Sequence, residues 1–109
     1  MTTSTLMLLA LGGWASIGEA TAQGPSYPCD KVEAGSVEEL ICKDGGLSAL
    51  DRKLAEVYAE AAKKASNEHP PVLKAEQRGW VKGRDDCWKS GDKRRCVEDE
   101  YQRRIAELQ

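Results

Sequence analysis

The chain of 109 residues has few of the side chains from which metal sites and nucleic-acid surfaces are built. It contains one histidine, His69, so it offers no histidine cluster for a metal ion. Its net charge of −2 is not the basic excess that nucleic-acid binding requires. Phenylalanine is absent, and beyond residue 22 the aromatic residues are few: Tyr27, Tyr58, Trp80, Trp88 and Tyr101. A core with so few large side chains is thin, which makes covalent cross-links important to stability.

Signals for catalysis are also missing. His69 lies in an Asn-Glu-His-Pro-Pro segment without an accompanying nucleophile. Neighbouring carboxylates occur at 85–86 and at 98–100, but successive residues on a helix point about 100° apart, so these groups do not converge on one cleft. We therefore expect solvated acidic faces. The sequence predicts a protein that is not an enzyme and has no catalytic, metal-binding or cofactor-binding residues.

The N-terminus has the pattern of an export signal. Residues 6–18 form a short, mostly apolar run, and small residues follow up to Ala20-Thr21-Ala22, the Ala-x-Ala pattern of signal peptidase sites. The run is too short to span a bilayer. A lipoprotein signal would need a cysteine directly after the run, whereas Cys29 lies further along the chain. We predict a signal peptide at residues 1–22 and one domain at residues 23–109, periplasmic or secreted, without a membrane span or lipid anchor.

Four cysteines follow this leader, and an even number in a short exported chain is typical of a disulfide framework. Three pairings are possible, of which we favour Cys29 with Cys42 and Cys87 with Cys96, because both close short loops. Each bond would stabilise the fold by about 3 kcal/mol by restricting the unfolded chain. The spacings within the pairs do not match the Cys-x-x-Cys motif of redox proteins or the closely spaced ligands of zinc sites.

The first half of the mature part shows two helical patterns. A capping-box pattern at residues 36–39 predicts a short helix that continues through Cys42. We expect Gly45-Gly46 to end this helix. From Leu47 the apolar residues recur at spacings of three and four, which predicts a second helix to about Ser66.

The second half shows two more. The prolines at 70–71 break the pattern, and the second of them suits the first position of a helix that extends to about Lys89. A turn at 90–92 leads to a final helix with an apolar stripe from Cys96 to Leu108. We predict an all-α fold, a small helical bundle or hairpin of one short and three longer helices stapled by two disulfides. The stripes of three helices predict one buried cluster: Leu54, Tyr58, Trp80, Tyr101 and Ile105.

Several motifs occur together, in order, around the four cysteines. They are Val37-Glu38-Glu39-Leu40-Ile41-Cys42, Leu47-Ser48-Ala49-Leu50-Asp51-Arg52-Lys53-Leu54, Glu76-Gln77-Arg78-Gly79-Trp80, Arg84-Asp85-Asp86-Cys87 and Tyr101-Gln102-Arg103-Arg104-Ile105-Ala106-Glu107-Leu108. In this combination the chain resembles the LprI-type lysozyme-inhibitor N-terminal domain family. The resemblance implies a small secreted or periplasmic bacterial helical domain, and some members are associated with inhibition of lysozyme. We therefore expect an inhibitor that acts by protein–protein binding. The alternative is a non-catalytic envelope interaction or stress-tolerance module with another partner.

Residues 87–96 are the candidate partner-binding segment. A lysozyme cleft is lined by carboxyl groups and shaped for sugar chains, so a protein that blocks it needs cations and an aromatic anchor on a projecting segment. Trp88, Lys93 and Arg94 supply these groups. The alternative, which we prefer on the sequence alone, is a plain hairpin in which Trp88 packs inward at helical spacing from Trp80.

Overall fold

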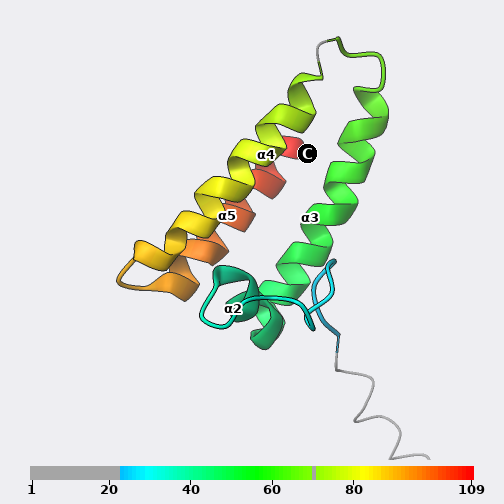
Figure 1. The fold of residues 1–109 in the computed structure, drawn as a ribbon. Coiled ribbons are helices and arrows are strands. Elements are labelled where there is room, and N and C mark those ends of the chain that lie inside the picture. Colours follow the sequence, from blue (N-terminus) through cyan, green and yellow to red (C-terminus); the bar gives the residue numbers. More distant parts are fainter. Residues whose placement is uncertain (1–22, 70) are drawn as a thin grey trace, which may run out of the picture.

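The computed structural model describes residues 23–69 and 71–109, and within them all regular structure is helical (Figure 1). The elements in chain order are α2 (Val37–Lys43), α3 (Gly45–Lys64), α4 (Val72–Asp85), the 3-10 helix η1 (Asp86–Lys89) and α5 (Lys93–Leu108). The all-α prediction of one short and three longer helices is confirmed. The predicted signal peptide, residues 1–22, lies outside the described residues.

Ser36 caps the N-terminus of α2 as predicted. Its hydroxyl accepts a hydrogen bond from the Glu39 amide at 3.1 Å, which is half of a capping box. The other half is shifted by one residue, because the Glu39 carboxylate accepts from the Gly35 amide at 2.9 Å. Gly35 has a φ of 82°, in the left-handed region that favours glycine, so this residue sets the turn into the helix.

We expected the Gly45-Gly46 pair to end α2, but this prediction is wrong. The two glycines form the first turn of α3. The reason is Asp44, which is the C-cap of α2 and the N-cap of α3. Its carboxylate accepts from the Leu47 amide at 3.0 Å and pairs with Arg94 of α5 at 2.8 Å. A Cβ added at Gly46 would lie 3.0 Å from Arg94 Nη2, so a glycine here leaves room for the arginine.

The three long helices α3, α4 and α5 run alongside one another in alternating directions, and α2 lies at the end where α3 begins (Figure 1). Helix α5 packs against both α3 and α4. The α3–α4 loop lies at one end of the molecule and the α4–α5 turn lies at the other (Figure 1). The surface around the α3–α4 loop is therefore far from the surface around the α4–α5 turn.

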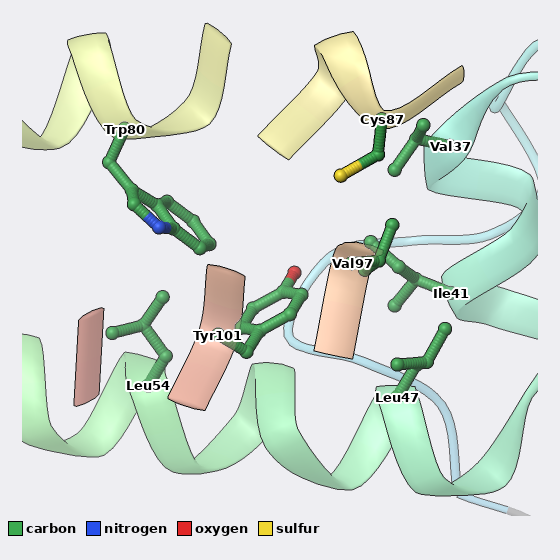
Figure 2. Packing of buried hydrophobic residues seen from close by; sticks show 8 residues of the cluster. All are labelled: Val37, Ile41, Leu47, Leu54, Trp80, Cys87, Val97 and Tyr101. Carbon is green, nitrogen blue, oxygen red and sulfur yellow. The ribbon is translucent and has the colours of Figure 1, made fainter. Parts of the chain in front are cut away.

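The core lies where α2 meets the three long helices (Figure 2). Leu54, Trp80 and Tyr101 are buried in it as predicted, and Ile105 is partly buried against them. The edge of the Trp80 ring system meets the Tyr101 ring at a centroid distance of 5.0 Å. The other members of the cluster come from α2, α3, η1 and α5 and were not among the five residues predicted: Val37, Ile41, Leu47, Cys87 and Val97.

Tyr58 is the predicted core residue that the structure places differently. Its side chain is half-buried and lies outside the cluster. The preceding residue, Val57, takes the buried position on this turn of α3, because successive helical residues are rotated by about 100°. An apolar stripe that contains both residues does not reveal which of them faces inward until the neighbouring helices are in place.

Both favoured disulfides are present, and no described cysteine is free. Cys29–Cys42 joins the N-terminal segment to α2, and Cys87–Cys96 joins η1 to α5. We call residues 87–96 the stapled turn. The N-terminal segment is also held to α3, where Arg52 donates a hydrogen bond to the Gly24 carbonyl at 2.6 Å.

Candidate functional site

The stapled turn places Trp88 on the surface. Its side chain is 58% exposed, and the Lys89 ammonium lies 5.8 Å from the ring centroid. At this distance the cation contacts the face of the indole without covering it. The interpretation that we preferred on the sequence, with Trp88 packed inward, is therefore wrong.

The cause of this exposure is the 3-10 geometry of η1. Trp80, Arg84 and Trp88 would share one face of a continuous α-helix, but α4 ends at Asp85. A 3-10 helix has 3.0 residues per turn instead of 3.6, so the inward position after Arg84 falls on Cys87. Cys87 is 1% exposed, and the next residue, Trp88, points outward.

Trp88 lies between two surface pockets of opposite charge. One, of about 250 Å³, is lined by Trp88 together with Leu40, Lys43, Lys93 and Arg94, and we call it the basic pocket. One carboxylate, from Glu39, also lines it and pairs with Lys43 at 3.4 Å. The other, of about 290 Å³, is also lined by Trp88 and contains three carboxylates, from Glu33, Glu38 and Asp85. The indole ring of Trp88 thus separates a pocket lined mainly by basic side chains from a pocket lined by acidic side chains.

The structure brings the three predicted partner-binding residues together at the basic pocket, but their environments differ. Lys93 is exposed. Arg94 pairs with Asp44 at 2.8 Å and with Glu98 at 2.9 Å, so its charge is already matched. The hydrogen bond from Arg94 holds the pKa of the Asp44 carboxyl below its usual range, as expected for a stable pair. Arg94 therefore joins α5 to the α2–α3 junction, whereas Trp88 and Lys93 remain available on the surface.

A buried polar network links the helices behind this surface. The Tyr101 hydroxyl donates to Asp51 at 2.7 Å and accepts from Arg84 at 3.1 Å. Arg84 also pairs with Asp85 at 2.8 Å. The second carboxylate oxygen of Asp51 accepts from the amide and the hydroxyl of Ser26, at 2.7 and 2.6 Å. Both buried charges thus have partners, which is the condition for tolerating charge inside a protein.

This network consists largely of residues from the motifs that carry the family resemblance. Asp51, Arg84 and Tyr101 are 6%, 5% and 0% exposed. Burial raises the pKa of the Tyr101 hydroxyl well above its usual range, although the nearby Arg84 charge opposes this shift. Sequence reasoning missed the network, because nothing in a helical pattern distinguishes a buried arginine from an exposed one. The motif residues hold the fold together, so they do not identify the binding surface.

No group of three or more His, Cys, Asp or Glu side chains in residues 23–69 and 71–109 is arranged to hold a metal ion. In the same part of the chain, no helix has the length and apolar character needed to cross a membrane.

Comparison with known proteins places these features in a family. A family model with the description "Lysozyme inhibitor LprI" matches residues 29–108. Proteins named Lipoprotein LprI from Mycobacterium bovis and Mycobacterium tuberculosis are 35% identical to the chain over 85 residues. Each alignment covers 78% of this chain but 41% of the relative, so the chain spans about two fifths of the length of these relatives. No solved structure is significantly similar. The family match includes both disulfides and the stapled turn.

Proposed function

Because the chain belongs to the LprI lysozyme-inhibitor family, we propose that it is a periplasmic or secreted inhibitor that binds lysozyme and blocks it without catalysis. Inhibition of this kind requires a surface that is complementary to the enzyme instead of a set of reacting groups. We assign this role to the stapled turn and the basic pocket beside it.

The observation that carries the proposal is the exposure of Trp88 on the stapled turn. Tryptophan is among the residues that contribute most to binding energy at protein interfaces, where its ring fills a pocket of the partner. A lysozyme cleft accommodates sugar rings beside two carboxyl groups. A flat indole ring with cations next to it is complementary to both features of such a cleft.

The cations are placed beside the ring. Lys93 lines the basic pocket together with Trp88. Lys43 and Lys89 also lie near the ring, and each pairs with a carboxylate, Glu39 at 3.4 Å and Asp86 at 3.7 Å. Ammonium groups that enter a cleft lined by carboxylates form charge-assisted hydrogen bonds, which are stronger than neutral ones. The net charge of the chain is close to zero, so we expect these contacts to act at short range and long-range steering to be weak.

The turn is also rigid before any partner arrives. The disulfide fixes its two ends, and the Ser90 amide donates to the Cys87 carbonyl at 2.9 Å. Asp92 caps α5 by accepting from the Arg95 amide at 3.0 Å. A segment that is already ordered loses little conformational entropy on binding, which favours affinity.

A cell-wall lysis assay with purified protein tests this proposal. We expect residues 23–109 to protect a cell-wall suspension from lysozyme in a dose-dependent manner. Replacing Trp88 and Lys93 together by alanine should weaken this protection while the melting temperature stays nearly unchanged, because both side chains are exposed. The matched control is Lys74→Ala, which removes an exposed cation from α4 and should leave protection intact.

Arg94 needs a separate variant, because the structure gives it a structural role. Arg94→Ala removes the ion pairs with Asp44 and Glu98, so a loss of protection could come from loosening of the α2–α3 junction. If the Trp88 and Lys93 double variant protects as well as the parent protein, the stapled turn is not the binding surface. If the parent protein binds cell walls or another envelope protein without protecting them, the chain is an envelope interaction module instead.

A further inference from the structure

A second hollow surface lies at the end of the molecule opposite the α4–α5 turn. It is lined by residues from the C-terminal half of α3, the N-terminal half of α4 and the end of α5. Two pockets of about 640 and 530 Å³ share the residues Ala61, Lys64, Leu73 and Glu76, and we treat them as one open-end cleft. Arg104, which lines the cleft, is eight residues from Cys96 on α5, and Leu73 is 14 residues from Cys87, so the helix rise places the cleft about 12–20 Å from the stapled turn.

Arg104 of α5 lines the open-end cleft with part of its hydrogen-bonding capacity unused. The residue is 6% exposed. Its Nε donates to Gln77 at 2.8 Å and its Nη1 donates to Glu107 at 3.2 Å. Its Nη2 is buried and has no hydrogen-bond partner among residues 23–69 and 71–109. A buried charged donor without an acceptor is unfavourable, so an additional oxygen atom within hydrogen-bond distance of Nη2 would stabilise this side chain.

The rest of the cleft combines apolar walls with a second cation. Ala61, Leu73 and Leu108 provide the apolar surface, and the exposed Lys64 lies beside them. Three carboxylates line the cleft, from Glu68, Glu76 and Glu107. Glu68 accepts a hydrogen bond from the Leu73 amide at 3.0 Å. Glu107 has one oxygen bound to Arg104 and the other to Arg103 at 3.0 Å. Both carboxylate oxygens of Glu107 are thus paired with arginine side chains.

We propose that the open-end cleft is a binding site for a small organic carboxylate with an apolar body. The carboxylate would accept a hydrogen bond from the exposed Lys64 ammonium and, after a small movement of the Arg104 side chain that opens Nη2 to the cleft, a second one from this guanidinium nitrogen. The apolar body would lie against Leu73 and Leu108. Glu68 and Glu76 are the other acidic groups of the lining, and their charges oppose the ligand. This site is independent of lysozyme inhibition.

Such a ligand has two sources, a hydrophobic residue at a free peptide C-terminus and an aliphatic acid. N-acetyl-leucine represents the first and hexanoate the second, and N-acetyl-leucinamide is the control that keeps the apolar body but lacks the charge. Titration of the full domain, followed by NMR, should shift the methyl signals of Leu73 and Leu108. We expect the acid to bind about tenfold more tightly than the amide, the factor for one hydrogen bond to a charged group.

Variants at the surface of the cleft sharpen the test without affecting the core. Lys64→Ala should weaken binding of the acid about two- to fivefold, and Glu76→Gln should strengthen it by a similar factor. Both side chains are exposed. Lys63→Ala is the matched control, because Lys63 is the neighbouring cation on α3 and does not line the cleft. Arg104→Lys keeps the charge but removes the guanidinium, and should reduce binding most.

The proposal fails if the amide binds as tightly as the acid, or if neither ligand shifts the methyl signals of the cleft. It also fails if Lys63→Ala and Lys64→Ala have the same effect. If Arg104→Lys is unstable, the other two variants still test the proposal, because Lys64→Ala should weaken binding of the acid and Glu76→Gln should strengthen it. If only N-acetyl-leucine or only hexanoate binds, the result assigns the source of the ligand.

Discussion

Trp80 makes three kinds of contact in the core. It is 7% exposed, its ring packs against Tyr101, and its indole N–H donates to the Glu100 carbonyl at 3.1 Å. The Arg84 guanidinium lies 5.7 Å from the ring centroid. We expect Trp80→Ala to lower the free energy of unfolding by about 3–5 kcal/mol, measured by chemical denaturation. Trp80→Phe should cost less, because it keeps a ring in the core. A near-neutral Trp80→Ala would contradict this packing.

Tyr27 should lower the stability of the domain at alkaline pH. Burial raises the pKa of its hydroxyl from 10.0 to about 12. Between these values the unfolded chain has lost the proton that the folded protein retains, so the free energy of unfolding falls as the pH rises. Below pH 10 both states are protonated and the effect is absent. Denaturation measured at several pH values should show this decline, and Tyr27→Phe should make it shallower. The shift of Tyr101 acts in the same direction, so a residual slope in Tyr27→Phe is expected.

At the residue scale, the sequence predicts chemistry better than it predicts burial. The disulfide partners followed from the number and spacing of the cysteines. The burial of Asp51, Arg84 and Arg104 did not, because each is buried beside a partner from another helix, Tyr101 for the first two and Gln77 for the third. The prediction that Trp88 is buried was wrong for a local reason. One 3-10 turn in place of an α-helical turn places this residue on the surface.

At the element scale, two glycines offer a matched comparison. A Cβ added at Gly79, within α4, would meet nothing within 4 Å, so Gly79→Ala should stabilise the protein by about 0.5–1 kcal/mol. Gly46→Ala should gain less or become destabilising, because its Cβ would lie 3.0 Å from Arg94 Nη2 and 3.3 Å from the Asp44 carboxylate. Thermal denaturation of the two variants measures the difference.

A double-variant cycle identifies the cause of that difference. In an Arg94→Ala background the obstruction is absent, so Gly46→Ala should become more favourable than it is in the parent protein. If the effect of Gly46→Ala is the same in both backgrounds, contact with Arg94 is not what opposes it.

The number and type of the helices were predictable, because they depend on the spacing of apolar residues. The exact ends of the helices were not predictable. The junction between α2 and α3 depends on Asp44, which caps both helices and is itself fixed by Arg94, 50 residues later in the chain. A Gly-Gly pair most often marks a helix end when it is seen without that partner. The boundary was therefore set by a tertiary contact that lies outside the local sequence.

At the scale of the whole molecule, the two candidate surfaces differ in how the sequence could reveal them. The stapled turn is contiguous, so its aromatic and basic residues could be recognised along the chain. The open-end cleft draws its lining from α3, α4 and α5, and becomes visible only when these helices are packed. The unpartnered Nη2 of Arg104 has no counterpart in the sequence pattern.

The two disulfides separate stability from binding, because only one of them fixes the stapled turn. Replacing Cys29 and Cys42 together by alanine, or Cys87 and Cys96 together, should lower the free energy of unfolding by about 3 kcal/mol in each case. Lysozyme protection, measured at a temperature where both variants are folded, should decline only in the second, since its turn is no longer ordered before binding. Circular dichroism at that temperature verifies folding. An equal loss of protection in both variants would show that global stability, and not the order of the turn around Trp88, governs inhibition.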